Sequence, residues 1–331
     1  MSKASKKDIL DEIRDFCEKF AEEKLAPYIK SIEAGHCSSA PKEINDAIWG
    51  TIKLQPIEVI VLDCPIVQRL RYIRQLGVVH WVYPGAVHTR FEHTLGVLHQ
   101  THELASAIND ATASPSGPPI EPRYVALLRL CALLHDIGHG VFSHVSEHAL
   151  GRRPDIRAAE QKFRVAHGLN KVQLSEIIAF YFICWKAFVE MIRVALECTP
   201  HQLHFASNSS ANAKEICQLI QKSIVGQGIS DQIPLLHEII SGPFDADKLD
   251  YFIRDAKLSG VPTMLDMSRH IQKVSVENLS ERDLPSDIAA KVKGGLQSYY
   301  LFGLKWSSSK VLDELHLARV FLYAKIYRHH K

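Results

Sequence analysis

Apolar side chains recur at a spacing close to 3.6 residues along most of the chain, which is the pattern of helices that bury one face. The first such stripe runs from Lys7 to Ile29 and has a highly charged opposite face, so it predicts a helix packed on the surface of the body. A free-standing helix that binds a partner is the alternative. Periodic segments of the same kind cover residues 59–76, 91–108, 124–137, 173–198, 216–224, 235–240, 248–258 and 311–327. Together they predict an all-α fold.

Strand signals are scarce, since β-branched residues rarely alternate with polar ones. Only residues 78–83 resemble a strand or a hairpin arm, so we expect at most a small β-hairpin. Polar stretches, some rich in Gly, Pro and Ser, predict loops at residues 35–41, 111–122 and 199–212. We therefore divide the chain into a helical extension with its loop, residues 1–40, and one large domain, residues 41–331.

The composition of the 331-residue chain is that of an ordinary globular protein, with 46% hydrophobic and 23% charged residues. A formal net charge of +2 gives no sign of a sequence-wide attraction to nucleic acid or anionic membranes, so any anion site must be a local cluster. Seven scattered cysteines, never spaced as CxxC, indicate reduced thiols. The chain shows no signal-peptide pattern and no uncharged apolar run of membrane-spanning length. We expect a cytoplasmic protein with no membrane partner, and nothing indicates a nucleic-acid partner.

Chemistry is concentrated at the end of the apolar segment 124–137, which closes with His135 and Asp136. An imidazole and a carboxylate at the end of a buried helix are unfavourable unless they are hydrogen-bonded or bind a metal. The pair is weak evidence alone, because about one His-Asp dipeptide is expected by chance in a chain with 18 histidines. Its meaning depends on what other segments supply.

Two further segments carry side chains that complement this pair. His93 stands near the start of the helix predicted over 91–108, and Asp247 shares one helical face with Tyr251 and Asp255. Two imidazoles and two carboxylates from three helices form a mixed nitrogen and oxygen site suited to Mn, Fe, Zn, Ni or Mg. Such an ion polarises a phosphoryl oxygen or lowers the pKa of bound water. Taken singly, His93 could be a capping or core histidine and Asp247 a first-turn aspartate, so the prediction rests on the combination.

The order of these residues resembles that of the HD-domain phosphohydrolase superfamily. Four flanking stretches are similar to its dNTP triphosphohydrolase branch, which includes bacterial dGTPases and the vertebrate sterile-alpha-motif/HD dNTPase: residues 63–77, 83–97, 135–144 and 245–255. The similarity runs from about residue 44 to the end of the chain and is weak between about 152 and 236. It implies the helical HD fold and metal-dependent cleavage of dNTPs to a deoxynucleoside and inorganic triphosphate.

The resemblance implies a role for each matching residue. A divalent metal would be held by His93, His135, Asp136 and Asp247. The catalytic candidates are His139, which would transfer a proton near the scissile bond, His144 and His167. Substrate phosphates would be clamped by Arg90, His144 and Lys248. The remaining substrate contacts, chiefly to the sugar, would come from Gln75, Leu76, Tyr251 and Asp255.

Some members of the family also have an activating nucleotide site. The positions that recognise a guanine base there are matched by Asp63, Gln68 and Arg71. An aspartate and an arginine can offer an acceptor and a donor fork to the edge of a base. The alternative is that residues 68–71 are only a charged helix face.

Three departures from the family pattern bear on these expectations. Trp49 stands where the family's turn carries a histidine. The family's His-Glu pair is matched at best by His167 and Gly168, which removes a carboxylate that would orient a catalytic imidazole. The chain also ends inside the helix predicted over 311–327, whereas family members continue into a subdomain with oligomer contacts. We therefore expect either a fragment or a shortened member.

Three functions remain open at this stage. The first is hydrolysis of dNTPs, with dGTP favoured, by a homo-oligomer that a guanine nucleotide activates. The second keeps the metal site but acts as a phosphatase or phosphodiesterase on another nucleotide. The third is a nucleotide-binding sensor with weakened catalysis. The missing carboxylate after His167 favours the third function, and the complete set of four metal ligands argues against it.

Overall fold

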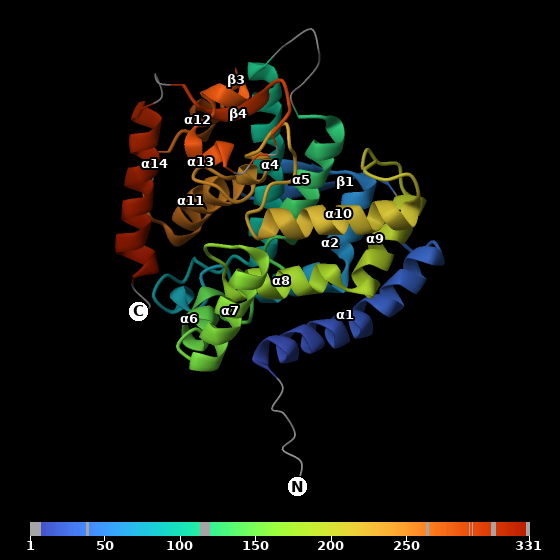
Figure 1. Ribbon diagram of the computed structural model, residues 1–331. Coiled ribbons are helices and arrows are strands. Elements are labelled where there is room, and N and C mark those ends of the chain that lie inside the picture. Colours follow the sequence, from blue (N-terminus) through green and yellow to red (C-terminus); the bar gives the residue numbers. More distant parts are fainter. Residues whose placement is uncertain are drawn as a thin grey trace.

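The helices that carry the predicted metal ligands lie in the centre of the molecule (Figure 1). The computed structural model describes residues 8–328 except 38–39, 113–119, 263–264, 291, 293 and 306–308. In it, α4 (Arg90–Ala111) packs against both α5 (Pro122–Leu134) and α11 (Ala246–Ser259). The apolar stripes of these helices are buried, as Leu98 and Leu130 illustrate. The three periodic segments predicted here are confirmed as helices.

A second group of helices covers one side of this centre. There α10 (Ser209–Ile224) contacts α5, α8 (Leu174–Cys184) and α9 (Lys186–Cys198). The predicted segment 173–198 is therefore two helices rather than one. The backbone of Trp185 between them is extended, with φ −76° and ψ 149°, and so ends the first helix and begins the second.

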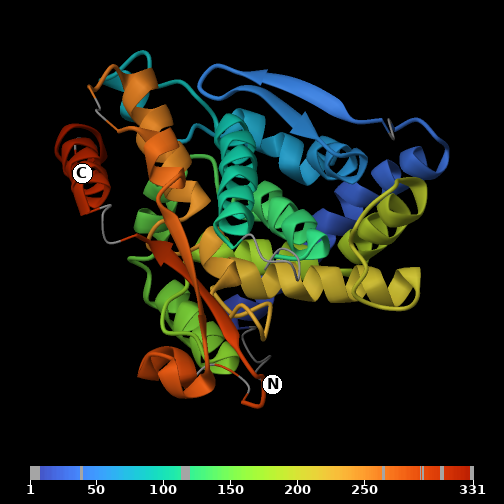
Figure 2. The same cartoon turned by 90° about the horizontal axis from the view of Figure 1, so that it is seen from above.

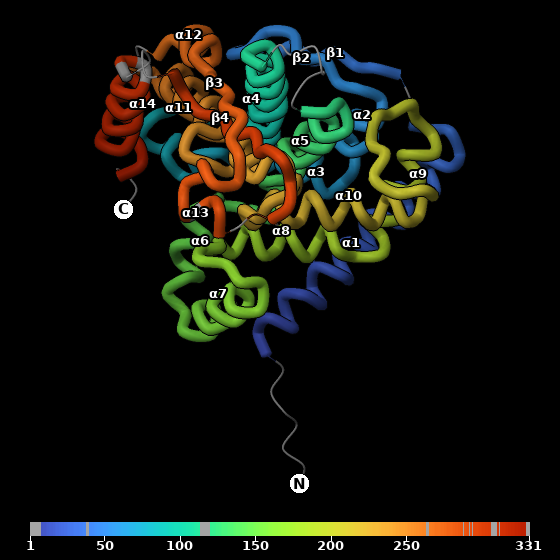
Figure 3. Tube along the Cα trace, turned by 45° about the horizontal axis from the view of Figure 1, so that its top comes forward, coloured from blue at the N-terminus to red at the C-terminus, as the bar shows by residue number. Residues whose placement is uncertain are grey.

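The N-terminal helix α1 (Ile9–Glu33) packs on the body. It contacts α7 (Pro154–His167), α8 and α9, and Figure 3 shows α1 and α7 along the same edge of the molecule. Its buried residues Cys17 and Leu25 belong to the same hydrophobic core as the residues of α4 and α5. The stripe predicted from Lys7 to Ile29 is thus a surface helix of the body and not a free-standing one.

Two antiparallel hairpins complete the fold of the described residues. Strands β1 (Lys42–Asp46) and β2 (Gly50–Leu54) form one, and β3 (Val274–Leu279) and β4 (Tyr299–Leu304) form the other. Figure 2 shows them on different sides of α4. The all-α class is confirmed, but the strand predicted over 78–83 is wrong. Half of that stretch is a short 3₁₀ helix, η2 (Val79–Trp81), and turn hydrogen bonds such as Val82 N to Val79 O continue it.

Proline breaks up the segment predicted over 59–76. It forms α2 (Pro56–Asp63), α3 (Pro65–Gln68) and the 3₁₀ helix η1 (Arg69–Tyr72), because Pro65 starts a new helix after an extended Cys64. The remaining short elements are α6 (His144–Leu150), η3 (Leu236–Ile239), α12 (Met267–Ile271), η4 (Glu281–Asp283) and α13 (Ser286–Ala289). The last helix, α14 (Ser309–Leu322), continues as a π-helical turn, Tyr323–Tyr327.

The predicted loops lie partly outside the described residues, which leave out 38–39 and 113–119. The helices on either side of the second loop end at Ala111 and begin at Pro122, as the composition predicts. The third loop is shorter than predicted, because Asn208 caps α10 and the helix begins at Ser209. None of the helices in the described ranges combines the length and apolar composition needed to cross a bilayer.

Candidate metal centre

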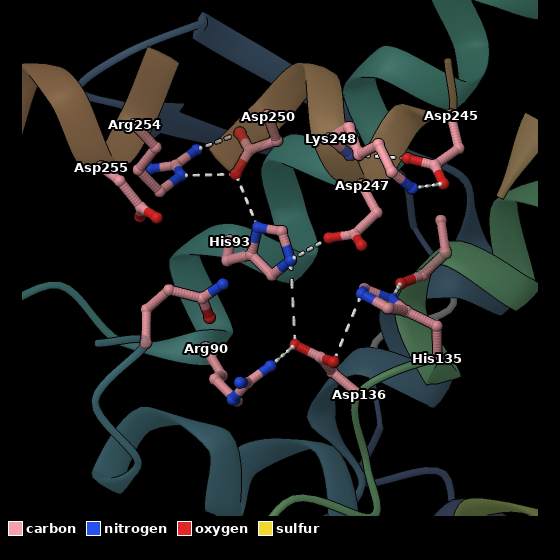
Figure 4. A network of polar contacts seen from close by, with 12 residues as sticks. Arg90, His93, His135, Asp136, Asp245, Asp247, Lys248, Asp250, Arg254 and Asp255 are labelled. Atoms are coloured by element: carbon pink, nitrogen blue, oxygen red, sulfur yellow. Dashed lines mark hydrogen bonds and ion pairs between the residues drawn. The ribbon is translucent and has the colours of Figure 1, made fainter. Parts of the chain in front are cut away.

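The ends of three helices bring the four predicted metal ligands to one place (Figure 4). His93 lies in the first turn of α4, and Asp247 lies in the first turn of α11. His135 caps the C-terminus of α5, and Asp136 follows it in the chain. The helix ends converge because α4 packs on both α5 and α11.

Each of these side chains has a donor atom within 4 Å of a donor atom of another member of the set. His93 Nε2 is 2.9 Å from Asp247 Oδ1 and 3.8 Å from Asp136 Oδ2. His135 Nε2 is 3.5 Å from Asp136 Oδ1, is buried, and has no hydrogen-bond partner among the described residues. Single donor atoms of His93, His135 and Asp136 all fall within 4.8 Å of one another. A buried, unpartnered imidazole nitrogen beside two carboxylates is unfavourable without a cation, so the set fits a divalent metal.

Opposite charges inside this cluster outweigh the effect of burial. Burial alone would lower the pKa of His93, but hydrogen bonds and charges from Asp247 and Asp250 raise it to about 10. Burial would raise the pKa of Asp136, yet the charges of Arg90 and two neighbouring imidazoles hold it well below its usual value. The cluster therefore favours positive charge at its centre, which a divalent metal would supply.

A third carboxylate, absent from the sequence-based prediction, holds the other ring nitrogen of His93. Asp250 Oδ2 is 2.7 Å from His93 Nδ1, and its side chain is completely buried. Arg254 binds the same carboxylate, with its Nε 2.8 Å from Oδ2. A carboxylate on Nδ1 fixes the tautomer of a histidine and leaves Nε2 free for a metal. Its position three residues after Asp247 was the available sequence signal.

A cavity of about 130 Å³ opens beside the ligands. The predicted catalytic and substrate-binding residues that line it are Gln75, Arg90, His139, His144 and Tyr251. The buried Arg90 joins the metal ligands to the cavity wall, since its NH1 is 2.5 Å from Asp136 Oδ2 and its Nε donates to Ser143 Oγ at 2.9 Å. The guanidinium is thus held rigidly between the candidate metal ligands and the cavity.

Three predicted substrate-binding residues lie outside the lining of the cavity: Leu76, Lys248 and Asp255. Lys248 Nζ donates to Asp245 Oδ2 at 2.5 Å. One oxygen of Asp255 is 2.8 Å from His88 Nε2, and the other accepts a hydrogen bond from Tyr327 at 2.6 Å. Both charged groups therefore have protein partners that a substrate would have to replace.

His139 and His144 stand side by side at the cavity, with their ring centroids 4.8 Å apart. His139 Nε2 is 3.3 Å from Asp136 Oδ1, and His144 Nδ1 is 2.8 Å from Glu147 Oε2. The other oxygen of Glu147 accepts a hydrogen bond from Ser175 N at 2.8 Å. Glu147 is a site residue that the sequence analysis missed, although it follows His144 by one helical turn.

The structure does not bring His167 to this cavity. It ends α7 and packs against Phe163 and Phe180, with ring centroids 4.2 and 4.9 Å away. The position of His167 therefore does not match the catalytic role expected for it. His167 is the last residue of α7, which Gly168 ends in the left-handed conformation.

Glu176 lines the cavity and was also missed from the sequence. Its Oε2 accepts a hydrogen bond from Gln173 N at 2.7 Å, within the capping box of α8. Burial, together with the charges of Glu147, Asp247 and Asp136, raises the pKa of Glu176 to about 7. This carboxyl group can therefore hold a proton near neutral pH. A capping box is common, so the sequence offered no distinctive signal.

The residues predicted to bind an activating nucleotide are in mutual contact. Gln68 Nε2 lies 3.4 Å from Asp63 Oδ1, and Arg71 Nε donates to Gln68 Oε1 at 2.7 Å. The guanidinium of Arg71 lies over the ring of Phe91, 3.5 Å from its centroid. Arg71 and Phe91 also line a second cavity, of about 350 Å³. The helix-face alternative remains open, because these contacts are internal to the protein.

Comparison with known proteins finds a family model and several relatives that match this chain. The model of the HD domain matches residues 90–194, which include His93, His135 and Asp136. Deoxynucleoside triphosphate triphosphohydrolase SAMHD1 of Xenopus laevis is 31% identical over 249 residues, which is 71% of this chain and 38% of that protein. Human SAMHD1 is 31% identical over 265 residues, covering 75% and 38% of the two chains.

Two proteins of undescribed activity are also similar. An uncharacterized protein of Methanocaldococcus jannaschii is 27% identical over 289 residues, covering 87% of this chain and 46% of that protein. A crystallised hypothetical protein from Aquifex aeolicus has a TM-score of 0.59 at 24% identity, over 87% and 60% of the two chains, and shows the fold alone. The chain spans less than half the length of these three curated relatives. On its motif and these relatives, the chain carries an HD domain over residues 90–194 and is similar to dNTP triphosphohydrolases.

Proposed function

We propose that this protein is a metal-dependent phosphohydrolase that converts dNTPs to deoxynucleosides and inorganic triphosphate. The observation that carries the proposal is the convergence of His93, His135, Asp136 and Asp247 beside a cavity lined by Arg90. A metal held there would polarise a phosphate oxygen and lower the pKa of a bound water. The substrate class is supported by the Xenopus and human relatives, which are named as dNTP triphosphohydrolases.

The chain's own residues would bind the phosphates and move protons. Arg90, buried and fixed by Asp136, would neutralise charge without rearranging. Burial and the charge of Arg90 lower the pKa of His139 to about 4, so its ring is neutral at pH 7 and would relay a proton rather than hold it. The carboxylate of Glu147 orients the ring of His144. Adjacent rings then offer a route for a proton to the leaving oxygen.

The sugar would lie at the end of the cavity formed by Gln75 and Tyr251. Asp255 would bind a sugar hydroxyl only in competition with Tyr327, which already donates to it. Lys248 would likewise have to exchange Asp245 for a phosphate. We include Leu76 in this group as the neighbour of Gln75.

A less highly charged phosphoester is the second candidate substrate. Arg90, in the cavity wall, is paired with Asp136, and Lys248, outside the lining, is paired with Asp245, so neither cation is free for a phosphate. Glu176 adds a carboxyl group to the wall. A nucleoside monophosphate or a phosphodiester would need less neutralising charge than a triphosphate.

We further propose that a guanine nucleotide binds near Asp63, Gln68 and Arg71 and activates a homo-oligomer. The position of Arg71 in the lining of the second cavity, over the ring of Phe91, supports this site. The division of the chain into residues 1–40 and 41–331 stays part of the same proposal. It would be tested by expression of residues 41–331 alone.

Product analysis tests the proposed function. The purified protein is incubated with each dNTP and with GTP, under Mn²⁺, Mg²⁺, Fe²⁺, Zn²⁺ and Ni²⁺ in turn, and the products are separated by anion exchange. We expect inorganic triphosphate from at least one dNTP and none from the His93→Ala variant. Orthophosphate from a monophosphate would favour the second candidate. A melting shift with dNTP but no product under any ion would indicate a sensor and overturn the proposal.

A further inference from the structure

The turn between β1 and β2 reaches the metal centre through Trp49. The indole Nε1 of Trp49 donates to Asp250 Oδ1 at 2.5 Å, across 201 positions of the sequence. The same Asp250 holds Nδ1 of His93. Trp49 is the residue that stands in place of the family's histidine, and nothing in the proposed chemistry uses it.

The carboxylate of Asp250 is saturated with donors. Oδ2 lies 2.7 Å from His93 Nδ1 and 2.8 Å from Arg254 Nε, and Oδ1 lies 2.5 Å from Trp49 Nε1 and 3.0 Å from Arg254 NH2 (Figure 4 shows the contacts of His93 and Arg254). A carboxylate has about four acceptor positions, so four donors leave it no freedom to rotate. Loss of the Trp49 donor would leave one acceptor position of Oδ1 unfilled, with only Arg254 NH2 still bound to that oxygen.

Trp49 is itself held firmly. Asp46 Oδ1 accepts hydrogen bonds from the backbone N–H groups of Ile48 and Trp49, both at 2.9 Å. Asp46 Oδ2 pairs with Arg254 NH1 at 2.9 Å, so the arginine that binds Asp250 also fastens the turn of the hairpin. The direction of the indole N–H is therefore fixed relative to α11.

We propose that Trp49 is a positioning residue of the metal centre: through Asp250, its indole N–H holds the ring of His93 at the angle that presents Nε2 to the metal. Asp250 contacts Nδ1 of His93, the ring nitrogen that would not bind the metal, and Trp49 contacts Asp250. Groups that orient a metal-binding histidine typically change metal affinity by about 10- to 100-fold when they are removed. The inference rests on the metal role of His93 in the proposed function, but not on any substrate or reaction.

Three variants separate the hydrogen bond from simple packing. Trp49→Phe keeps an aromatic ring beside His99 and removes the N–H, whereas Trp49→His restores an N–H donor. Trp185→Phe is the matched control, because the buried Nε1 of Trp185 has no partner among the described residues. Mn²⁺ affinity is measured by electron paramagnetic resonance, and the Co²⁺ derivative by its visible spectrum. Melting of each metal-free protein reports folding.

We expect Trp49→Phe to bind Mn²⁺ about 10-fold more weakly, with an altered Co²⁺ spectrum and a folded metal-free state. Trp49→His recovers most of the affinity, and Trp185→Phe keeps the wild-type affinity. Wild-type affinity and spectrum in Trp49→Phe would overturn the inference, as would an equal loss in Trp185→Phe.

If Trp49→Phe does not fold, the Co²⁺ spectrum of Trp49→His is compared with that of Trp185→Phe, because the smaller imidazole ring would hold Asp250 at a different angle. A spectrum of Trp49→His that differs from that of Trp185→Phe would support the inference. Identical spectra of the two variants would contradict it. The wild-type protein could bind Mn²⁺, lose this binding in His93→Ala, and yet hydrolyse no nucleotide. That result would refute the proposed function and leave this inference standing.

Discussion

Four histidines at or near the candidate site lie against a carboxylate, whereas His135 Nδ1 is hydrogen-bonded to the backbone oxygen of Ala132. The pairs are His93 with Asp250, His139 with Asp136, His144 with Glu147, and His88 with Asp255. A carboxylate fixes the tautomer and direction of an imidazole, which a metal ligand or a proton carrier requires. The carboxylate missing after His167 therefore does not leave the cavity's imidazoles without orienting partners.

A histidine away from the site makes the stability of the protein depend on pH. Burial lowers the pKa of His270 to about 4, whereas an exposed histidine titrates near 6.5. Between about pH 6.5 and 4, His270 is therefore protonated in the unfolded chain but neutral in the folded protein. The free energy of unfolding falls over this range as the pH drops, by up to about 3 kcal/mol. His270→Phe should flatten this part of the pH profile of the unfolding free energy, measured with urea. Parallel profiles for the two proteins would contradict the prediction.

The ligands could be predicted from the sequence, but most of their supports could not. His135 and Asp136 close an apolar helix, where polar groups need an explanation, and two other helical segments supply their complements. Asp250 and Glu147 follow site residues by one helical turn and were within reach of the same reasoning. Trp49 was not, because only the folded chain places it against Asp250.

At the scale of elements, the site depends on how closely α4 approaches α11. Gly96 makes this approach possible, since a Cβ atom there would lie 1.8 Å from Asp250 Oδ1 and 2.5 Å from Arg254 NH2. Both of those side chains are buried and paired, so neither can move aside at low cost. The glycine thus belongs to the support of the metal centre rather than to a turn.

Gly96→Ala should therefore destabilise the protein strongly. Overpacking and disruption of the buried ion pair together should lower the free energy of unfolding by about 3 kcal/mol or more. Gly303→Ala, at a position in β4 with no heavy atom within 4 Å of the added carbon, should change it by less than about 0.5 kcal/mol. Urea unfolding of the two variants checks the difference. Equal stabilities would show that the helices can separate without penalty.

Periodicity predicted the long helices well and the small hairpins poorly. The segments that became α4, α5 and α11 have a wide apolar stripe, which a central helix requires. Strand β1 is mostly exposed or half-buried, so it shows no alternation of apolar and polar residues for sequence analysis to detect. Residues 78–83 were wrongly predicted as a strand because they are mostly apolar. Two of these apolar side chains, Trp81 and Val82, are exposed rather than packed in a core.

At the scale of the whole molecule, a bound metal would tie together chain segments that are far apart in sequence. The ligands come from α4, α5 and α11, so an ion that binds only the folded state must stabilise all three. At a metal concentration about 100 times the Kd, the gain is about 2.7 kcal/mol. We expect the melting temperature to rise by several degrees with Mn²⁺ and to return with EDTA. His135→Ala should show no such rise, and an equal rise in this variant would place the ion elsewhere.

The most direct test of the metal centre counts the ions bound by single-ligand variants. Equilibrium dialysis against Mn²⁺ is carried out with the wild-type protein and with His93→Ala, His135→Ala, Asp136→Ala and Asp247→Ala. The wild type should bind one ion tightly, and every variant should bind it at least about 100-fold more weakly, because each removes a direct ligand. Retention of wild-type affinity by any one of the four variants would contradict the shared site.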